Sequence, residues 1–270
     1  MAGGQGLHPW RSHLIFLLLF AGIVLAAHAP YLDLPFFWDE LGYFIPAALD
    51  LYQSARWIPA STEANSHPPL VMAYLALTWK LAGYSITAAR LAMLLLAGVT
   101  VFLAFLLAVQ LCRDRPGVPA LVAVVFMLAS PLIYTQSMMA QLDMPAMLFT
   151  TLSLLLFLRG SHAGAALACT ALVLTKETGV VVPLVFLLWL AKGGLRSAAW
   201  FLLPLAALSA WFVLVWHSTG HLFGSAKFTD YNLLYPAHPF RLAVSLLKRG
   251  YGLFVADFHW VGTAAIFAAR

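Results

Sequence analysis

Residues 88–111 read AARLAMLLLAGVTVFLAFLLAVQL, and Arg90 is the only charged side chain among them. A helix needs roughly 20 apolar residues to cross a bilayer, so this run is long enough to span one. The rest of the chain has the same character, since 63% of its 270 residues are hydrophobic and 9% are charged. Its mean hydropathy of +0.89 is far above that of a soluble globular domain. The sequence therefore predicts an all-α integral membrane protein.

Seven further apolar runs are predicted to cross the membrane. They cover residues 14–29, 118–134, 144–158, 163–175, 178–191, 197–216 and 253–269. The runs at 163–175 and 178–191 are short for a full crossing, so we expect helix tilt or a locally thinned bilayer there. The first run resembles a signal peptide, but no small-residue cleavage site precedes Pro30. This favours an uncleaved anchor.

These spans group into one large unit and a shorter second part. Residues 1–216 form the predicted transmembrane module, with a first outer loop at about 30–87. Residues 217–270 are expected to be a second outer loop followed by the last span. The chain stops at the end of an apolar run, so we expect either a fragment or an unusually short member of its class.

The distribution of charge predicts the orientation. With the N-terminus inside the cell, the short inner segments are dense in basic residues, as the positive-inside rule expects: Arg11, Arg113, Arg115, Arg159, Lys192 and Arg196. Of the ten acidic residues, only Asp114 falls on that side, and Asp257 is one of those placed outside. We therefore expect an inner-membrane protein with its active site on the outer, periplasmic face. The pI of about 9.4 indicates contact with anionic membrane lipid and no nucleic-acid partner.

An adjacent acid pair, Asp39-Glu40, lies just outside the first span in the stretch FFWDELGY. Two carboxylates at the edge of a bilayer are costly to desolvate, which favours a functional role over packing. Residues 36–52 are predicted to form an interfacial helix. Its apolar, bilayer-facing side would consist of Phe37, Leu41, Phe44 and Ala48. Asp39 and Tyr43 fall on the opposite, polar side.

A second feature of the first outer loop is His67, which precedes Pro68 and Pro69. The two prolines fix an extended turn, so His67 would be held rigidly as a proton carrier, phosphate ligand or metal ligand. A solvated loop side chain is the structural alternative. Residues 70–83 are too short for an obvious span and are predicted to form a helix against the membrane. Two cysteines, one in a loop and one in a span, predict neither a disulfide nor a metal site.

The order of these motifs resembles a known family. Along the chain come Asp39-Glu40, His67-Pro68-Pro69-Leu70, Arg90-Leu91, Gln141-Leu142-Asp143-Met144-Pro145 and Leu174-Thr175-Lys176-Glu177. This arrangement is similar to the GT-C glycosyltransferases of family 39, which include protein O-mannosyltransferases and the bacterial aminoarabinose transferase that modifies lipid A. The resemblance covers roughly residues 10–220.

The resemblance implies a GT-C type helical module with interfacial helices in its first outer loop. It also implies transfer of a hexosyl or pentosyl group from a polyprenyl-phosphate carrier to a protein, lipid or glycan acceptor outside the cytoplasm. The acid that serves as the family's proposed catalytic base matches Asp39, and Glu40 stands beside it as the second catalytic-site acid, expected to orient a ligand or the acceptor.

Other family positions match the substrate-binding candidates. The family's second-loop acid matches Asp143, and its His- or Lys-Pro-Pro-Leu element begins at His67. The basic residue after its fifth span matches Lys176, which is followed here by Glu177 where the family often has glycine. That departure changes the surroundings of the expected phosphate site.

The chemistry expected of such an enzyme adds further candidates. Direct displacement would invert the anomeric centre. Lys176 would stabilise the charge on the departing phosphate, and Arg241, Lys248 or Arg249 could add to this. Tyr43 is a candidate for orienting the sugar. Some relatives carry a divalent metal ion near the acidic residues. The corresponding ligands would be Asp39, Glu40 and His67.

Structural explanations stand beside these functional ones. Asp143 is alternatively a helix cap, Lys176 and Glu177 a plain surface ion pair, and Arg90 a side chain that snorkels to the interface. For the whole protein, the alternatives are a non-enzymatic transporter or flippase and a truncated, inactive relative.

Overall fold

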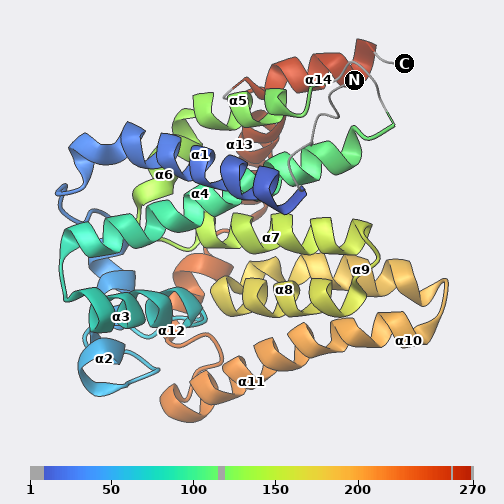
Figure 1. Ribbon diagram of the computed structural model, residues 1–270. Coiled ribbons are helices and arrows are strands. Elements are labelled where there is room, and N and C mark those ends of the chain that lie inside the picture. The colour runs from blue at the N-terminus through green and yellow to red at the C-terminus, as the bar shows by residue number, and fades with distance from the viewer. Residues whose placement is uncertain (1–8, 115–118, 257, 269–270) are drawn as a thin grey trace, which may run out of the picture.

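The computed structural model describes residues 9–114, 119–256 and 258–268. Within these residues every regular element is a helix, which confirms the all-α prediction (Figure 1). Arg115 and Asp257, which entered the predicted charge asymmetry, lie outside the described residues.

The α-helices follow one another without any strand in the described ranges. They are α1 (Pro9–His28), α2 (Ile45–Ser54), α3 (Leu70–Ala82), α4 (Ile86–Leu111), α5 (Leu121–Ala129), α6 (Pro131–Met138), α7 (Asp143–Leu158), α8 (His162–Thr175), α9 (Val181–Ala191), α10 (Leu195–Ala198), α11 (Leu202–Thr219), α12 (Ala226–Thr229), α13 (Pro239–Phe254) and α14 (His259–Ala268). Short 3-10 or π-helical turns join some of them: η1 (Ala29–Tyr31), η2 (Glu40–Phe44), η3 (Glu177–Val180), η4 (Ala199–Phe201) and η5 (Asp230–Leu234).

The described part of the chain holds three uninterrupted stretches long and apolar enough to cross a membrane. They are Arg11–Tyr31, Ile86–Leu111 and Leu195–Thr219. Two further pairs, α5 with α6 and α13 with α14, would qualify as spans only if each bent pair is one crossing. The helices α3, α7 and α8 are apolar but shorter, and so is the stretch Glu177–Ala191 that contains α9.

Two predicted spans are not single helices. The run at 118–134 bends by 76° between α5 and α6. Ser130 stands in extended conformation there, because the ring of Pro131 disfavours a helical residue before it. The run at 253–269 is interrupted between Phe254 and His259, where α13 meets α14 at another 76° bend. Each of these two predicted spans therefore contains a sharp bend, which the apolar pattern alone did not indicate.

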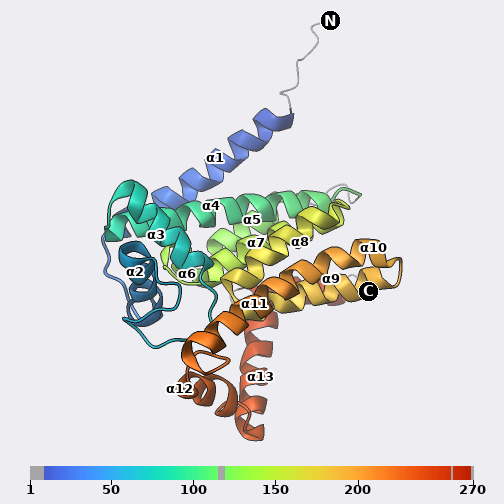
Figure 2. The ribbon, with the colours of Figure 1, turned by 90° about the horizontal axis from the view of Figure 1, so that it is seen from below.

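The bundle is a series of neighbouring helices, with α1, α4, α7, α8 and α11 packed in that order (Figure 1). Gly98 allows the close contact between α1 and α4, since a Cβ atom added there would lie 2.8 Å from the Cα atom of Ala21. Figure 2 shows α13 leading away from this bundle. The segment predicted as the first outer loop contains α2 and α3 and covers one end of α4; we keep this name for it below as a label that does not fix its side of the membrane.

The first outer loop packs differently from its prediction. A π-helical turn, η2, passes into α2 at Ile45, one residue before Pro46. Phe44 and Ala48 belong to a buried core shared with α3, whereas Phe37 is exposed. The predicted apolar face therefore does not lie on the bilayer as one unit, because half of it packs against α3. The predicted helix at 70–83 is confirmed as α3.

Candidate functional site

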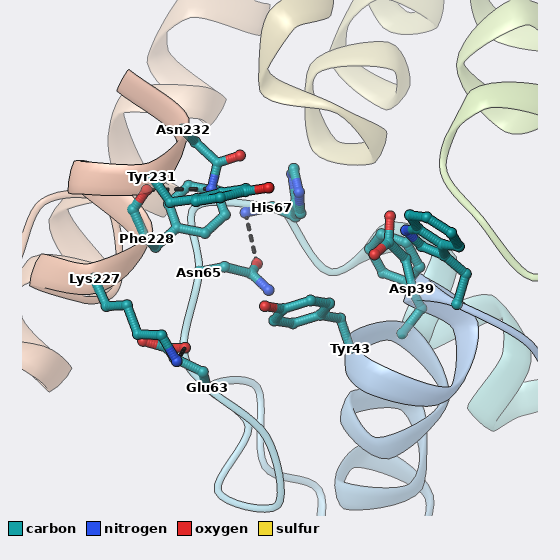
Figure 3. Close-up of a pocket in the computed structure, with 11 residues that line it drawn as sticks. Asp39, Tyr43, Glu63, Asn65, His67, Lys227, Phe228, Tyr231 and Asn232 are labelled. Carbon is teal, nitrogen blue, oxygen red and sulfur yellow. Dashed lines mark hydrogen bonds and ion pairs between the residues drawn. The ribbon is translucent and has the colours of Figure 1, made fainter. Parts of the chain in front are cut away.

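A cavity of about 480 Å³ lies between the first outer loop and the segment that follows α11. Its lining side chains come from three parts of the chain, as Figure 3 shows. They are Trp38, Asp39, Tyr43 and Phe44; Glu63, Asn65 and His67; and Lys227, Phe228, Tyr231 and Asn232. Three residues predicted from the sequence, Asp39, Tyr43 and His67, are thus brought together, and we call this cavity the site pocket.

The first wall of the site pocket is the turn at Asp39 and η2. Trp38 has a φ of +55°, a left-handed conformation that is uncommon for a non-glycine residue. Asp39 and Tyr43 then face the cavity. Among the described residues, no hydrogen bond or ion pair is recorded for the carboxylate of Asp39. It is therefore open to a ligand.

Glu40 lies in a different environment from Asp39. Its carboxylate has no exposed surface and forms an ion pair with Arg90. Its two oxygens also accept the backbone N–H groups of Phe37 at 3.0 Å and Ala140 at 2.6 Å. The adjacent acids are thus not equivalent, because Glu40 is fully engaged inside the protein while Asp39 faces the cavity.

Arg90 connects Glu40 to the surrounding chain. Its side chain is 2% exposed, so the snorkelling alternative is wrong. The guanidinium donates to the backbone oxygens of Leu34 at 3.3 Å, Pro35 at 3.0 Å and Met138 at 2.9 Å. The ion pair consequently fixes the loop before Asp39 to α4 and to the turn that precedes α7.

The second wall is the loop that ends at His67. The backbone N–H of His67 donates to Asn65 Oδ1 at 3.0 Å, and the indole of Trp211 in α11 donates to the backbone oxygen of Ser66 at 3.0 Å. The imidazole lies between the rings of Phe44 and Phe228, with centroid distances of 5.8 and 5.6 Å. His67 is therefore a held side chain, and the alternative of a solvated loop histidine is wrong.

His67 also has a charged partner. Its Nδ1 atom lies 3.0 Å from Oε2 of Glu177, which belongs to η3 and lies outside the helices long enough to span a membrane. Burial alone would raise the pKa of Glu177. The hydrogen bond and charge of His67, together with the charge of Lys176, outweigh burial and hold that pKa below its usual value. Glu177 is accordingly a carboxylate at neutral pH.

The third wall is the segment formed by α12 and η5. Glu63 ties it to the first outer loop, accepting from Ser225 Oγ at 2.8 Å and lying 3.5 Å from Lys227 Nζ. Gly224 has a φ of +91° and sits against Ala64, where an added Cβ atom would lie 2.6 Å from the backbone. Only glycine fits this approach, so the segment closes tightly on the loop.

Sequence analysis missed this third wall. Lys227, Phe228, Tyr231 and Asn232 recur at helical spacing in the second outer loop, which is the one signal that could have identified them. Nothing in that pattern says which cavity they face.

Asp143, Lys176 and Arg241 do not line the site pocket. Lys176 Nζ lies 2.5 Å from Asp143 Oδ1, joining the end of α8 to the start of α7. The structural alternative of a surface ion pair between Lys176 and Glu177 is therefore wrong. The side chain of Asp143 makes no capping hydrogen bond. Arg241 in α13 lies 3.5 Å over the ring of Tyr235 and lines a separate groove.

The predicted metal ligands do not fit a metal site. Both oxygens of Glu40 are engaged by Arg90 and backbone donors, and Nδ1 of His67 is engaged by Glu177. Within the described ranges, no three His, Cys, Asp or Glu side chains are grouped closely enough to hold a metal ion. We therefore derive no step through a metal.

The fold and the site pocket together define a polytopic helical membrane protein of the GT-C type. The chain belongs to the dolichyl-phosphate-mannose-protein mannosyltransferase family, whose model matches residues 66–221. This confirms the family resemblance carried by the motifs.

Solved structures support the same fold. The crystal structure of ArnT from Cupriavidus metallidurans bound to undecaprenyl phosphate matches with a TM-score of 0.60 and 20% identity, over 83% of this chain and 44% of that one. The apo state of that ArnT matches with a TM-score of 0.56 and 20% identity, over 82% of this chain and 44% of that one. This chain thus spans less than half the length of these relatives. No curated protein matches it.

Proposed function

We propose that this protein is a membrane glycosyltransferase that moves a sugar from a polyprenyl-phosphate carrier to an acceptor on the non-cytoplasmic side of the inner membrane. The observation that carries the proposal is an unpaired carboxylate, Asp39, in a pocket lined with aromatic rings and carboxamides. Family membership supports sugar transfer, and the undecaprenyl phosphate bound by the ArnT relative supports a carrier of that type.

Asp39 is the proposed general base. An acceptor hydroxyl or amine attacks the anomeric carbon from the side opposite the phosphate, and its proton passes to the Asp39 carboxylate. The bond from the anomeric carbon to the phosphate oxygen breaks, and the carrier leaves as a polyprenyl phosphate. One displacement of this kind inverts the anomeric centre. A positioned base of this type contributes about 10²–10⁴-fold to the rate.

The other lining residues suit a sugar phosphate. The rings of Tyr43 and Tyr231 offer apolar faces with hydroxyl groups, and the amides of Asn65 and Asn232 can bond sugar hydroxyls. His67 is the proposed contact to the donor phosphate. These groups identify neither the sugar nor the acceptor, which is a protein, lipid or glycan.

The remaining candidates take supporting roles in the proposal. Glu40 acts through Asp39 as a positioning residue, because its carboxylate is enclosed and faces Arg90. The pair of Asp143 with Lys176 is exposed, so its lysine can turn towards a lipid phosphate at the membrane surface. Arg241 is proposed to contact phosphate away from the site pocket, in the groove beside Tyr235.

The test is transfer from a polyprenyl-phosphate sugar by the full chain in liposomes. The donor is identified first, by mass spectrometry of lipid-linked sugars that co-purify with the protein. Asp39→Asn is expected to lower kcat/KM by about 10²–10⁴-fold while leaving the amount of inserted protein unchanged. Asp33→Asn is the matched control, because Asp33 is an exposed acid of the same loop that pairs with Thr87.

Two results would contradict the proposal. Transfer by Asp39→Asn at the wild-type rate would remove the base assignment. Carrier-dependent counterflow in liposomes without any sugar transfer would favour the transporter alternative over the enzyme.

A further inference from the structure

The partnership of His67 with Glu177 joins segments 110 residues apart in the sequence. Both side chains are partly enclosed, with 22% and 18% of their surfaces exposed. Because a carboxylate can only accept a hydrogen bond, the 3.0 Å contact requires that Nδ1 of His67 carries the hydrogen. The contact therefore engages Nδ1 of His67 with Glu177 inside the protein.

The other ring nitrogen remains available. No hydrogen bond to Nε2 of His67 is recorded within the described residues, and the histidine lines the site pocket. The flanking rings of Phe44 and Phe228 restrict rotation of the imidazole. Together with the Glu177 contact, this packing holds the ring in one orientation.

The charged residues that line the pocket indicate which ligand Nε2 of His67 could contact. The other basic residue of the described lining, Lys227, is paired with Glu63, and its side chain is largely exposed. When Nδ1 directs its hydrogen to Glu177, an imidazole that also carries a hydrogen on Nε2 has a second N–H donor on the side of the pocket. Such a donor, held at a fixed angle, suits a phosphate oxygen.

We infer that Glu177 is a positioning residue for His67, holding the imidazole so that Nε2–H donates to the phosphate of the lipid-linked sugar. The inference rests on the proposed function. It gives a purpose to the contact of Glu177 with His67, because a histidine needs an orienting partner on one ring nitrogen, whereas a lysine ammonium presents its donors in all directions.

The test is a double-mutant cycle on the full chain in liposomes. Glu177→Gln is made in the wild type and in a His67→Lys background, and the donor KM and kcat are measured for all four proteins. We expect Glu177→Gln to raise the donor KM about tenfold in the wild type, with a smaller change in kcat. In the His67→Lys background it should not raise the KM, because the ammonium does not need orienting.

A conservative variant and a binding assay separate positioning from folding and from failure of the proposed function. Glu177→Asp should restore part of the donor affinity, because it keeps a carboxylate. Retention of polyprenyl phosphate by the same four proteins, measured by native mass spectrometry, reports the coupling without turnover. If wild type binds the carrier with the expected coupling but transfers no sugar, only the proposed function fails.

The inference is overturned by either of two results. An equal loss of carrier affinity on Glu177→Gln in both backgrounds would mean that Glu177 supports the fold and does not act through His67. No loss of affinity in the wild type would mean that His67 needs no orienting partner. Transfer that still depends on Asp39 would leave the proposed function standing in both cases.

Discussion

Replacing Arg90 by methionine is expected to destabilise the protein by about 3–5 kcal/mol, the cost typical of removing one partner of a buried ion pair. The structure supports the upper part of that range. Glu40 has no exposed surface, so its carboxylate would remain buried with only two backbone donors. Three backbone oxygens, those of Leu34, Pro35 and Met138, would also lose a charged donor.

The free energy of unfolding is to be measured by denaturant titration of the purified protein in detergent micelles. Arg159→Met is the matched control, since Arg159 is exposed at the end of α7 and its replacement should change stability by less than about 0.5 kcal/mol. The double variant Glu40→Leu/Arg90→Met removes both charges and should recover most of the lost stability. It should not recover transfer, because the contacts that hold the loop before Asp39 are gone.

The reasoning would be refuted by an Arg90→Met protein whose stability lies within about 1 kcal/mol of the wild type. It would also be refuted by a double variant that regains full sugar transfer. That second result would mean that Asp39 needs no anchoring by the buried pair.

Two further predictions concern packing and pH. Gly98→Leu should lower the free energy of unfolding by about 1–3 kcal/mol or more, because its Cβ would meet the backbone of Ala21, and Gly98→Ala should lower it by less. Thermal unfolding measures both effects. Variants with the same Tm as the wild type would contradict the close approach of α1 and α4. Burial alone would raise the pKa of Asp50, but hydrogen bonds from Ala60 and Ser61 and the nearby charge of Arg56 hold it below the ordinary value of 3.8. Asp50 should therefore stabilise the loop above pH 3.8 and lose this contribution as pH falls through the lowered pKa, so the stability gap to Asp50→Asn should shrink with acid; a gap that widens would contradict this sign.

The sequence predicted the membrane fold well because length and apolarity decide whether a helix can span. It could not place the bend at Ser130 within an apolar run, although Pro131 was the available signal. Sequence analysis also placed Phe44 and Ala48 against the bilayer, because the same apolar helix face can pack against lipid or against a protein core. Which of the two covers a helix depends on tertiary packing, here against α3.

For the candidate site, the sequence was a better guide to which residue types belong to it than to which side chains contact one another. Asp39 and His67 line one pocket as their motifs suggested, yet the contacts of the motif residues are long-range. The adjacent residues Lys176 and Glu177 have separate partners, Asp143 and His67 respectively. The backbone directs the side chains of two adjacent residues differently, and nothing in the local sequence reveals that they contact different partners.

The third wall of the site pocket has a consequence for biogenesis. During synthesis the chain is made from its N-terminus, so Asp39 and His67 enter the membrane surface long before residues 225–234 exist. Until Ser225 and Lys227 reach Glu63, the proposed base Asp39 lacks the third wall of the site pocket. A half-made chain therefore carries Asp39 without the complete site pocket, and the proposed sugar site forms only after residues 225–234 have been added.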